Sequence, residues 1–341
     1  MSKYLSWMAR ETKSKWWNDS ADFKELEIAI SDGAVGVTTN PVLVCRTLYD
    51  DPDFWKPYLQ GIQPDLSLAD RIEEIIRRVT VAVADRMASF YVNNNDGYVC
   101  AQVDPSKASD RDAMLAMAKR LHNWAPNIAV KLPVTKAGLD VLEECVAEGI
   151  TVAATVSFTL PQVLAVARRY EKGIIRCSKA GITPGRCFAV IMVGRIDDYI
   201  RDVVRDNDIE GIYETDIIQC GSAIMKRAIA LFKKEGYSAT LMPAGKRGAY
   251  HVTDLSGAGV TFSIHPKIQK LTETVAEPFV ERWEEDIDSE VIERLCTCEQ
   301  FVKAYDADGM KEEEFITYGV VQKTLAQFTE NWNKIGQFRI D

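Results

Sequence analysis

Several features that mark particular protein classes are missing from this sequence of 341 residues. It contains only three histidines, His122, His251 and His265, and these form no cluster with the scattered cysteines. A structural metal would need such a cluster, so we expect no metal site. The sequence also has no run of lysine and arginine, and its formal net charge is −9. Nucleic acid prefers a basic face, so we expect no nucleic-acid partner.

Membrane and export signals are also missing. The uncharged stretch 149–167 contains threonine, serine, proline and glutamine, which dilute its apolar character too far for a membrane span. We predict a strand followed by a helix there. Near the N-terminus, Lys3, Arg10 and Glu11 interrupt the apolar residues, which argues against a signal peptide. Without an export signal, we expect the eight cysteines to be reduced and the protein to be cytoplasmic.

The remaining composition is that of an ordinary globular protein. Apolar residues make up 47% of the chain and charged residues 27%, enough to bury a large core. The length allows one large domain or two average ones. A single α/β barrel needs about 250 residues plus insertions, which also fits. Because the chain is acidic, an anionic substrate would require a local basic pocket.

Short apolar runs alternate with amphipathic helices along most of the chain. After the run 128–134, for example, Leu139, Leu142 and Val146 share one helical face, and Gly149 ends that helix. The predicted strands are 16–19, 35–39, 98–103, 128–132, 152–158, 188–193, 239–243 and 260–264. This pattern predicts an α/β fold, a (β/α)8 TIM barrel, with an open doubly wound sheet as the alternative. No Gly-x-Gly-x-x-Gly follows an early strand, which argues against a dinucleotide site.

The C-terminal part is highly charged and helical in pattern. We expect one domain over 1–341, with the barrel at about 14–275 and a C-terminal helical extension at about 276–341. Phe315, Val321, Leu325 and Phe328 form an approximate apolar stripe in its last part. A long terminal helix could cover the barrel mouth, bind another subunit of a homo-oligomer, or simply pack, and the simple packing role is favoured.

A lysine interrupts one of the apolar strands. Lys131 lies within Ile-Ala-Val-Lys-Leu-Pro-Val, and a parallel strand is normally buried on both faces. Burying an ammonium group costs several kcal/mol unless it is paired or neutral. The simplest alternative is that its head group reaches solvent at the strand end, since Pro133 follows. A neutral lysine in an apolar pocket can instead attack a carbonyl and form a Schiff base.

Polar residues follow other strands. Thr39 and Asn40 end one apolar strand, and Asp19 and Gln102 lie at two others. Each is individually more often a cap than a catalyst, but together with Lys131 they would gather at the mouth of a barrel.

Basic residues follow the late strands. Arg195 comes after the strand at 188–193, and Lys246 and Arg247 come after the strand at 239–243. Barrel enzymes often bind phosphate around their late strands, and arginine binds it through paired hydrogen bonds. These residues predict a local basic pocket that binds the phosphate group of a phosphorylated substrate.

Five segments, in this order, resemble signature segments of the transaldolase family. They are Trp-Asn-Asp19-Ser-Ala-Asp, Gly-Val-Thr-Thr-Asn40-Pro, Val-Lys131-Leu-Pro-Val-Thr, Val-Gly-Arg195-Ile-Asp-Asp and Leu-Met-Pro-Ala-Gly-Lys-Arg247. The resemblance covers roughly residues 16–271. It implies a (β/α)8 barrel with a class I aldol mechanism and with neither a metal nor an organic cofactor.

The resemblance also implies a phosphorylated sugar as substrate and a role for each matching residue. Lys131 would form a Schiff base with a ketose, and Asp19 would take the hydroxyl proton that triggers carbon–carbon cleavage. A dihydroxyacetone unit would then pass from a ketose phosphate to an aldose phosphate, as in pentose phosphate metabolism. The expected substrate contacts are Thr39, Asn40, Thr155, Arg195, Lys246 and Arg247, with the arginines on the phosphate.

Some positions depart from the family pattern. Gln102 stands at a catalytic position where the pattern of transaldolases has Glu. In this it resembles the smaller fructose-6-phosphate aldolase branch, which has Gln there. Ala153 replaces an Asn, Val190 and Gly245 each replace a Ser, and Met192 stands where a Phe or Tyr is usual. Chain length favours the larger transaldolases. A lyase that releases free dihydroxyacetone and a non-catalytic phosphosugar-binding barrel remain alternatives.

Overall fold

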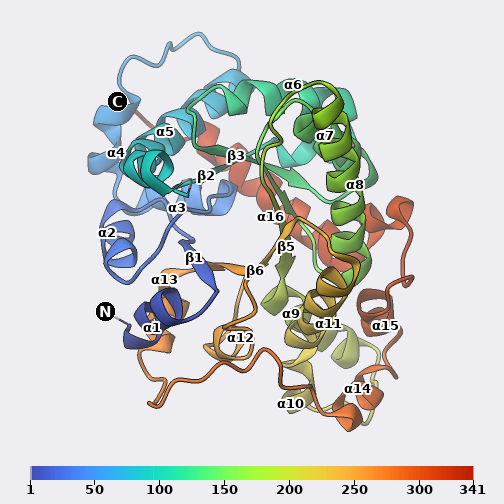
Figure 1. Ribbon diagram of the computed structural model, residues 1–341. Coiled ribbons are helices and arrows are strands. Elements are labelled where there is room, and N and C mark those ends of the chain that lie inside the picture. The colour runs from blue at the N-terminus through green and yellow to red at the C-terminus, as the bar shows by residue number, and fades with distance from the viewer. Residues whose placement is uncertain (1, 95, 341) are drawn as a thin grey trace.

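The computed structural model describes residues 2–94 and 96–340 and shows an α/β barrel of parallel strands surrounded by helices (Figure 1). The strands β2 to β6 pair in chain order, and β1 pairs with β7, in every case in parallel. The strands are β1 (Lys15–Asn18), β2 (Val99–Gln102), β3 (Ile128–Pro133), β4 (Val152–Thr155), β5 (Cys187–Met192), β6 (Thr240–Ala244) and β7 (Thr261–Ile264).

The segment predicted as a strand at 35–39 is a short bridging segment and not a regular strand. Val37 makes isolated parallel bridges to Asn18 of β1 and to Val99 of β2, so the segment takes the second place in the barrel. Its extended part is short because Asn40 already caps the next helix. The two sheets also adjoin at β6 and β7. These strands contact each other, although no strand pairing joins them within the described residues.

The other strand predictions are confirmed, with one correction of length. Six of them begin and end within one residue of the observed strands. The strand expected at 152–158 ends at Thr155, because Val156 has a φ of 52° and a left-handed residue cannot continue an extended strand. Its side chain is β-branched, which makes this conformation unusual.

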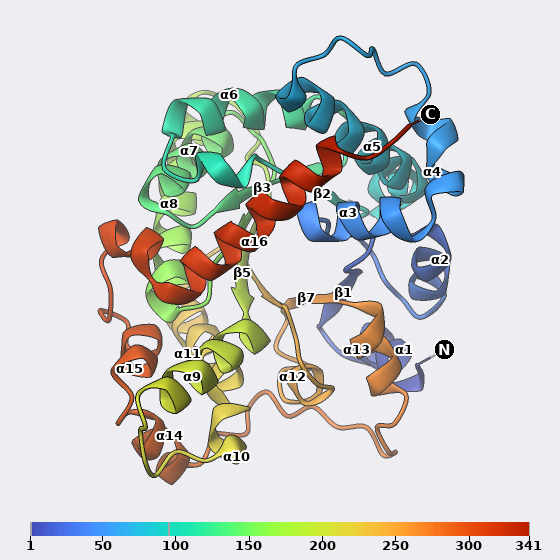
Figure 2. The same ribbon diagram turned by 180° about the vertical axis from the view of Figure 1, so that it is seen from behind.

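Helices follow the strands and cover the barrel from outside (Figures 1 and 2). Side-chain caps fix where several begin: the Thr135 hydroxyl, for example, accepts a hydrogen bond from Gly138 N at 3.0 Å. None of the helices in the described part of the chain is both long and apolar enough to cross a lipid bilayer. The helices are α1 (Lys3–Glu11), α2 (Phe23–Ser31), α3 (Pro41–Asp50), α4 (Pro52–Leu59), α5 (Leu68–Asn94), α6 (Arg111–His122), α7 (Lys136–Ala147), α8 (Leu160–Lys179), α9 (Val193–Asp206), α10 (Glu214–Ile217), α11 (Cys220–Glu235), α12 (Tyr250–Thr253), α13 (Pro266–Thr272), α14 (Ser289–Leu295), α15 (Glu299–Tyr305) and α16 (Gly319–Gly336), with short 3₁₀ helices η1 (Pro105–Lys107) and η2 (Glu312–Thr317).

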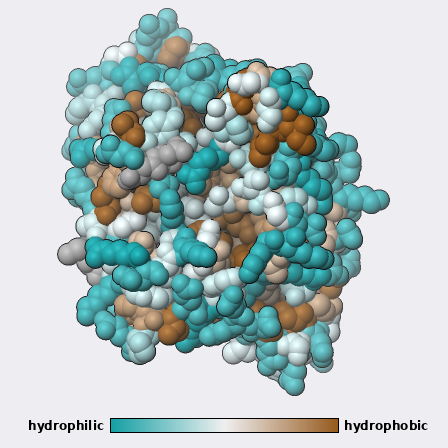
Figure 3. Space-filling view, in the orientation of Figure 1, coloured by the Kyte–Doolittle hydropathy of each residue, from teal (hydrophilic) through white to brown (hydrophobic). Residues whose placement is uncertain are grey.

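The last long helix, α16, lies across the face at which the strands end. It packs against α3, η1 and α9, which all begin near the carboxyl ends of strands, and also against α5. Figure 2 shows it running diagonally in front of the barrel. Its apolar side chains Val321 and Phe328 are buried there. The C-terminal helix therefore covers part of the barrel mouth. On the opposite face, hydrophilic residues dominate and hydrophobic ones form separate patches (Figure 3).

Candidate active site

A cavity of about 490 Å³ opens at the carboxyl ends of the strands, where barrel enzymes place their catalytic residues. It brings together most of the predicted site residues although they are far apart in the sequence. The predicted residues that line it are Asp19, Asn40, Lys131, Thr155, Arg195, Lys246 and Arg247. Thr39 and Gln102 lie behind this lining, next to Lys131.

Lys131 is buried in the strand β3 and does not reach solvent at the strand end, since only 6% of it is exposed. Its Nζ donates a hydrogen bond to the carbonyl oxygen of Thr39 at 3.1 Å. The Thr39 hydroxyl donates to the Cys100 carbonyl at 2.7 Å, so Thr39 positions the lysine through its main chain. In the strand register, Lys131 lies between Gln102 on β2 and Ala153 on β4.

Gln102 is buried beside Lys131. Its Oε1 has no hydrogen-bond partner among the described residues. A buried amide oxygen without a partner costs about 1–3 kcal/mol, which a bound water or substrate hydroxyl would recover.

Asp19 follows β1 and, among the described residues, is the only carboxylate that lines the cavity. Its Oδ1 accepts a hydrogen bond from the Thr38 hydroxyl at 2.6 Å. Thr38 Oγ1 in turn lies 2.7 Å from Ser263 Oγ on β7. These contacts fix the carboxylate at the mouth of the barrel through its Oδ1. Its Oδ2 accepts no hydrogen bond from the described residues.

Among the charged side chains of the same cavity, basic ones predominate. A protein whose net charge is −9 thus gathers positive charge around a single carboxylate. The sequence predicted a local basic pocket for an anionic substrate, and this cavity has the matching charge. The basic residues are Arg46, Lys131, Arg195, Lys246, Arg247 and Lys267.

Arg195 and Arg247 lie side by side at the rim. A Cβ atom at Gly194 would lie 2.6 Å from Gly245 O, so only a glycine lets these two segments approach so closely. Burial, and then the neighbouring Arg247, lower the pKa of Arg195 to about 10. Arg247 forms an ion pair with Asp198 at 2.7 Å, whereas no ion pair of Arg195 is found within the described residues. A largely buried guanidinium without a carboxylate partner favours an anionic ligand.

The helix α16 reaches this arginine. Nη1 of Arg195 donates to Thr324 Oγ1 at 3.5 Å, and its guanidinium lies 5.6 Å from the ring centroid of Phe328. The C-terminal helix therefore forms part of the surroundings of the candidate anion site.

Lys246 and Arg247 are neighbours in the sequence but take different directions. Gly245 has a φ of 60°, a left-handed turn that directs Lys246 back into the barrel. Its Nζ donates to the carbonyl oxygens of Pro243 and Ser263, each at 2.7 Å. Burial lowers its pKa to about 7, and the charge of Asp19 opposes this shift.

A buried Asp–His pair, which the sequence did not reveal, supports the basic rim. His251 Nε2 lies 2.9 Å from Asp197 Oδ2, and both side chains are completely buried. Nδ1 of His251 accepts a hydrogen bond from Arg247 N at 3.2 Å, which assigns the ring proton to Nε2, facing the carboxylate. Burial raises the pKa of Asp197, and the neighbouring His251 opposes this shift. The pair joins α9 to the turn that carries Arg247.

Removing the histidine should destabilise the protein. We expect His251→Ala to lower the free energy of unfolding by about 2–4 kcal/mol, because it leaves the buried Asp197 carboxylate without its partner. Urea denaturation measures this loss. The double variant with Asp197→Asn also removes the buried charge and should recover a substantial part of the stability. Equal losses in the single and double variants would show that the pair is not the origin.

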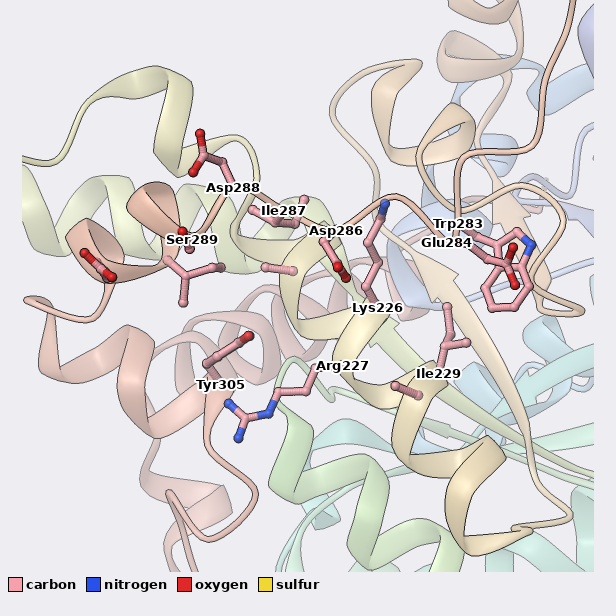
Figure 4. Close-up of a pocket in the computed structure, with 14 residues that line it drawn as sticks. Lys226, Arg227, Ile229, Trp283, Glu284, Asp286, Ile287, Asp288, Ser289 and Tyr305 are labelled. Atoms are coloured by element: carbon pink, nitrogen blue, oxygen red, sulfur yellow. The ribbon is translucent and has the colours of Figure 1, made fainter.

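A larger groove of about 1000 Å³ lies elsewhere, between α11 and the segment 283–293 (Figure 4). Its two cationic groups already have partners in the protein: Arg227 pairs with Asp306 at 3.1 Å, and Lys226 Nζ donates to the Arg282 carbonyl at 2.9 Å. None of the predicted site residues lines it. In the described part of the chain, no three His, Cys, Asp or Glu side chains gather in a way that could hold a metal.

Comparison with known proteins agrees with this geometry. A family model described as "Transaldolase/Fructose-6-phosphate aldolase" matches residues 16–338. The "Probable transaldolase" of Geobacter sp. (strain M21) is 29% identical over 278 residues, which cover 79% of this chain and 98% of that protein. The "Transaldolase" of Kocuria rhizophila is 31% identical over 176 residues, and the "Transaldolase 1" of Streptomyces avermitilis is 33% identical over 189 residues. Those matches cover 50% and 51% of this chain, and it spans about half of each relative, 48% in both cases.

The family match covers almost the whole barrel together with the helix over its mouth. It therefore includes each strand end that contributes a side chain to the cavity. The chain belongs to the transaldolase/fructose-6-phosphate aldolase family.

Proposed function

We propose that this chain transfers a dihydroxyacetone unit from a ketose phosphate to an aldose phosphate through a Schiff base on Lys131. The observation that supports this most is the buried amine of Lys131 together with the carboxylate of Asp19, in a cavity whose other charged side chains among the described residues are basic. Three of the relatives carry transaldolase in their names. The proposed setting is the carbohydrate metabolism of the pentose phosphate pathway.

The reaction would begin with the lysine. The neutral amine of Lys131 attacks the ketose carbonyl, water leaves, and a Schiff base forms that can accept an electron pair. Asp19 then takes a proton from the substrate hydroxyl next to the bond that breaks. The aldehyde product leaves, and the bonding electrons remain with the Schiff base as an enamine. Addition of this enamine to an acceptor aldehyde reverses these steps, and Asp19 returns its proton.

The remaining cavity residues would hold the substrate. Asn40 uses its Oδ1 to cap α3, accepting from Leu43 N at 3.1 Å, which leaves its amide N–H groups for a sugar hydroxyl. Thr155 lines the cavity at the end of β4. Arg195, Arg247 and Lys246 supply the positive charge, with the two arginines at the rim for the phosphate.

A second candidate function is that of a lyase that releases free dihydroxyacetone. Gln102 favours it, because its amide lies in register with Lys131 and cannot carry a proton as a carboxyl would. Ala153 on the other side of Lys131 offers no polar group either. Both functions proceed through the same Schiff base and enamine. In the transferase the enamine adds to an acceptor aldehyde, whereas in the lyase it is protonated and dihydroxyacetone is released by hydrolysis.

The proposal is tested by trapping the intermediate. The protein is incubated with fructose 6-phosphate and borohydride, and its intact mass is measured. We expect an adduct of the size of dihydroxyacetone, and none with borohydride alone. Turnover that requires an added aldose phosphate would indicate the transferase, and turnover without an acceptor the lyase. If a panel of ketose phosphates gave no adduct but still raised the melting temperature, the chain would be a non-catalytic phosphosugar-binding barrel.

A further inference from the structure

The cavity contains a second buried lysine amine, that of Lys246, which the proposed reaction uses only for charge. It is held between the ends of β6 and β7 by two carbonyl oxygens, those of Pro243 and Ser263. Its Nζ also lies 5.1 Å from the ring centroid of Phe262. No salt bridge to Lys246 is found in the part of the chain that the structure describes. Two acceptors, one ring and burial define its environment.

This environment is suited to an amine that changes its charge. A neutral amine has two N–H donors, and the carbonyls of Pro243 and Ser263 satisfy both. The protonated form has a third N–H, for which the ring of Phe262 offers a weak cation–π contact. The pKa of about 7 that burial gives Lys246 agrees with this geometry.

The contacts of Lys246 lead to Asp19. Ser263, whose carbonyl accepts from Lys246, places its Oγ 2.7 Å from Thr38 Oγ1. The Thr38 hydroxyl gives its single proton to Asp19 Oδ1 at 2.6 Å, so Ser263 must be the donor to Thr38. Ser263 thus contacts the amine through its main-chain carbonyl, and through its hydroxyl it contacts Thr38, which holds the carboxylate.

The other charged groups around the cavity do not share this arrangement. Basic groups face it from β3 with Lys131, from α9 with Arg195, from the adjoining turn with Arg247, and from α3 with Arg46. The residues at the start of α13, His265 and Lys267, face it beyond the end of β7. Within residues 2–94 and 96–340, Asp19 is the only acidic side chain in this lining, so the attractive effect of a charge on Lys246 falls on Asp19.

We propose that Lys246 is a positioning residue for Asp19, and that the presence or absence of a proton on its amine sets how strongly the Asp19 carboxylate takes the substrate hydroxyl proton. This inference rests on the proposed function. A protonated Lys246 stabilises the ionised carboxylate and makes it a weaker base. When Lys246 is neutral, the proton affinity of Asp19 rises and cleavage becomes faster. The cleavage step itself is unchanged: the proton moves to Asp19, and the electron pair moves to the Schiff base.

The test compares pH profiles of cleavage in variants that fix the charge of this group. In the unaltered protein, the rate should rise about five- to tenfold through a transition near pH 7, where Lys246 loses its proton. Lys246→Gln keeps two N–H donors but cannot titrate, so at saturating substrate the transition should be lost and the cleavage rate at low pH should stay high, whatever the loss in substrate affinity. Lys246→Arg is always charged, so the rate should stay low across the range.

Lys226→Met is the matched control. Lys226 is another partly buried lysine whose Nζ donates to two main-chain carbonyls, those of Arg282 and Glu285, and whose pKa is lowered by burial. It lies in the separate groove beside α11 (Figure 4), so this variant should keep the transition.

The possible failures can be told apart. If both Lys246 variants kept the transition near pH 7 and also kept the borohydride adduct, this inference would be wrong and the proposed function would stand. If the unaltered protein gave no adduct with any ketose phosphate, the proposed function itself would be wrong. Thermal unfolding verifies that each variant is folded. Lys246→Met, which is neutral and cannot titrate, replaces Lys246→Gln in the comparison if the glutamine variant does not fold.

Discussion

Lys131→Met is expected to remove the trapped adduct and to lower turnover by at least about 10³-fold, because methionine has no amine to form the Schiff base. The side chain of methionine fills a similar volume within the buried strand β3. The only hydrogen bond of Lys131 Nζ among the described residues is the one to the Thr39 carbonyl, so its loss should leave the fold intact. Intact-mass measurement after borohydride treatment, together with steady-state kinetics, tests this prediction.

Lys136→Met is the control for this substitution. Lys136 lies five residues further along, at the surface, where its ammonium pairs with Glu313 at 2.6 Å. Because exposed ion pairs contribute little, the control should retain both the adduct and the turnover. An adduct that persisted in Lys131→Met and mapped to Lys246 would contradict the prediction and move the nucleophile to the second buried amine.

Asp19→Asn is expected to block carbon–carbon cleavage, the step that follows formation of the Schiff base. The Schiff base should still form, but the hydroxyl proton would have no acceptor, so cleavage should fall by about 10²- to 10⁴-fold. Borohydride should then trap the whole ketose phosphate on Lys131 in place of a dihydroxyacetone-sized fragment. Asparagine keeps an oxygen that can accept the hydrogen bond from Thr38, so the local structure should persist. The mass of the adduct distinguishes the two intermediates directly.

Asp22→Asn makes the same chemical change three residues away. Asp22 caps α2 by accepting a hydrogen bond from Glu25 N at 2.8 Å, and asparagine is an equally good cap. This control should give the dihydroxyacetone-sized adduct at an unchanged rate. A dihydroxyacetone-sized adduct formed at the normal rate by Asp19→Asn would mean that another group takes the proton.

The sequence by itself determined the elements of this protein that depend on local patterns. Strand positions followed from short apolar runs, and the anomaly of Lys131 was visible because a charge interrupts such a run. Since the carboxyl ends of parallel strands meet on one face, the sequence pattern was sufficient to predict that polar residues at those ends lie close together. Where local backbone geometry departs from the pattern, as at Val156, the predicted strand was too long.

Only the tertiary structure decided how side chains with similar local surroundings are used. Lys246 and Arg247 are adjacent and both basic, yet the turn at Gly245 buries the amine between the ends of β6 and β7 and leaves the guanidinium at the rim. The contact of Asp197 with His251 and the placement of α16 over the mouth join segments that no local periodicity relates. Such contacts depend on how complete elements pack against one another, and the free energy of burying a charge depends on all the groups that surround it.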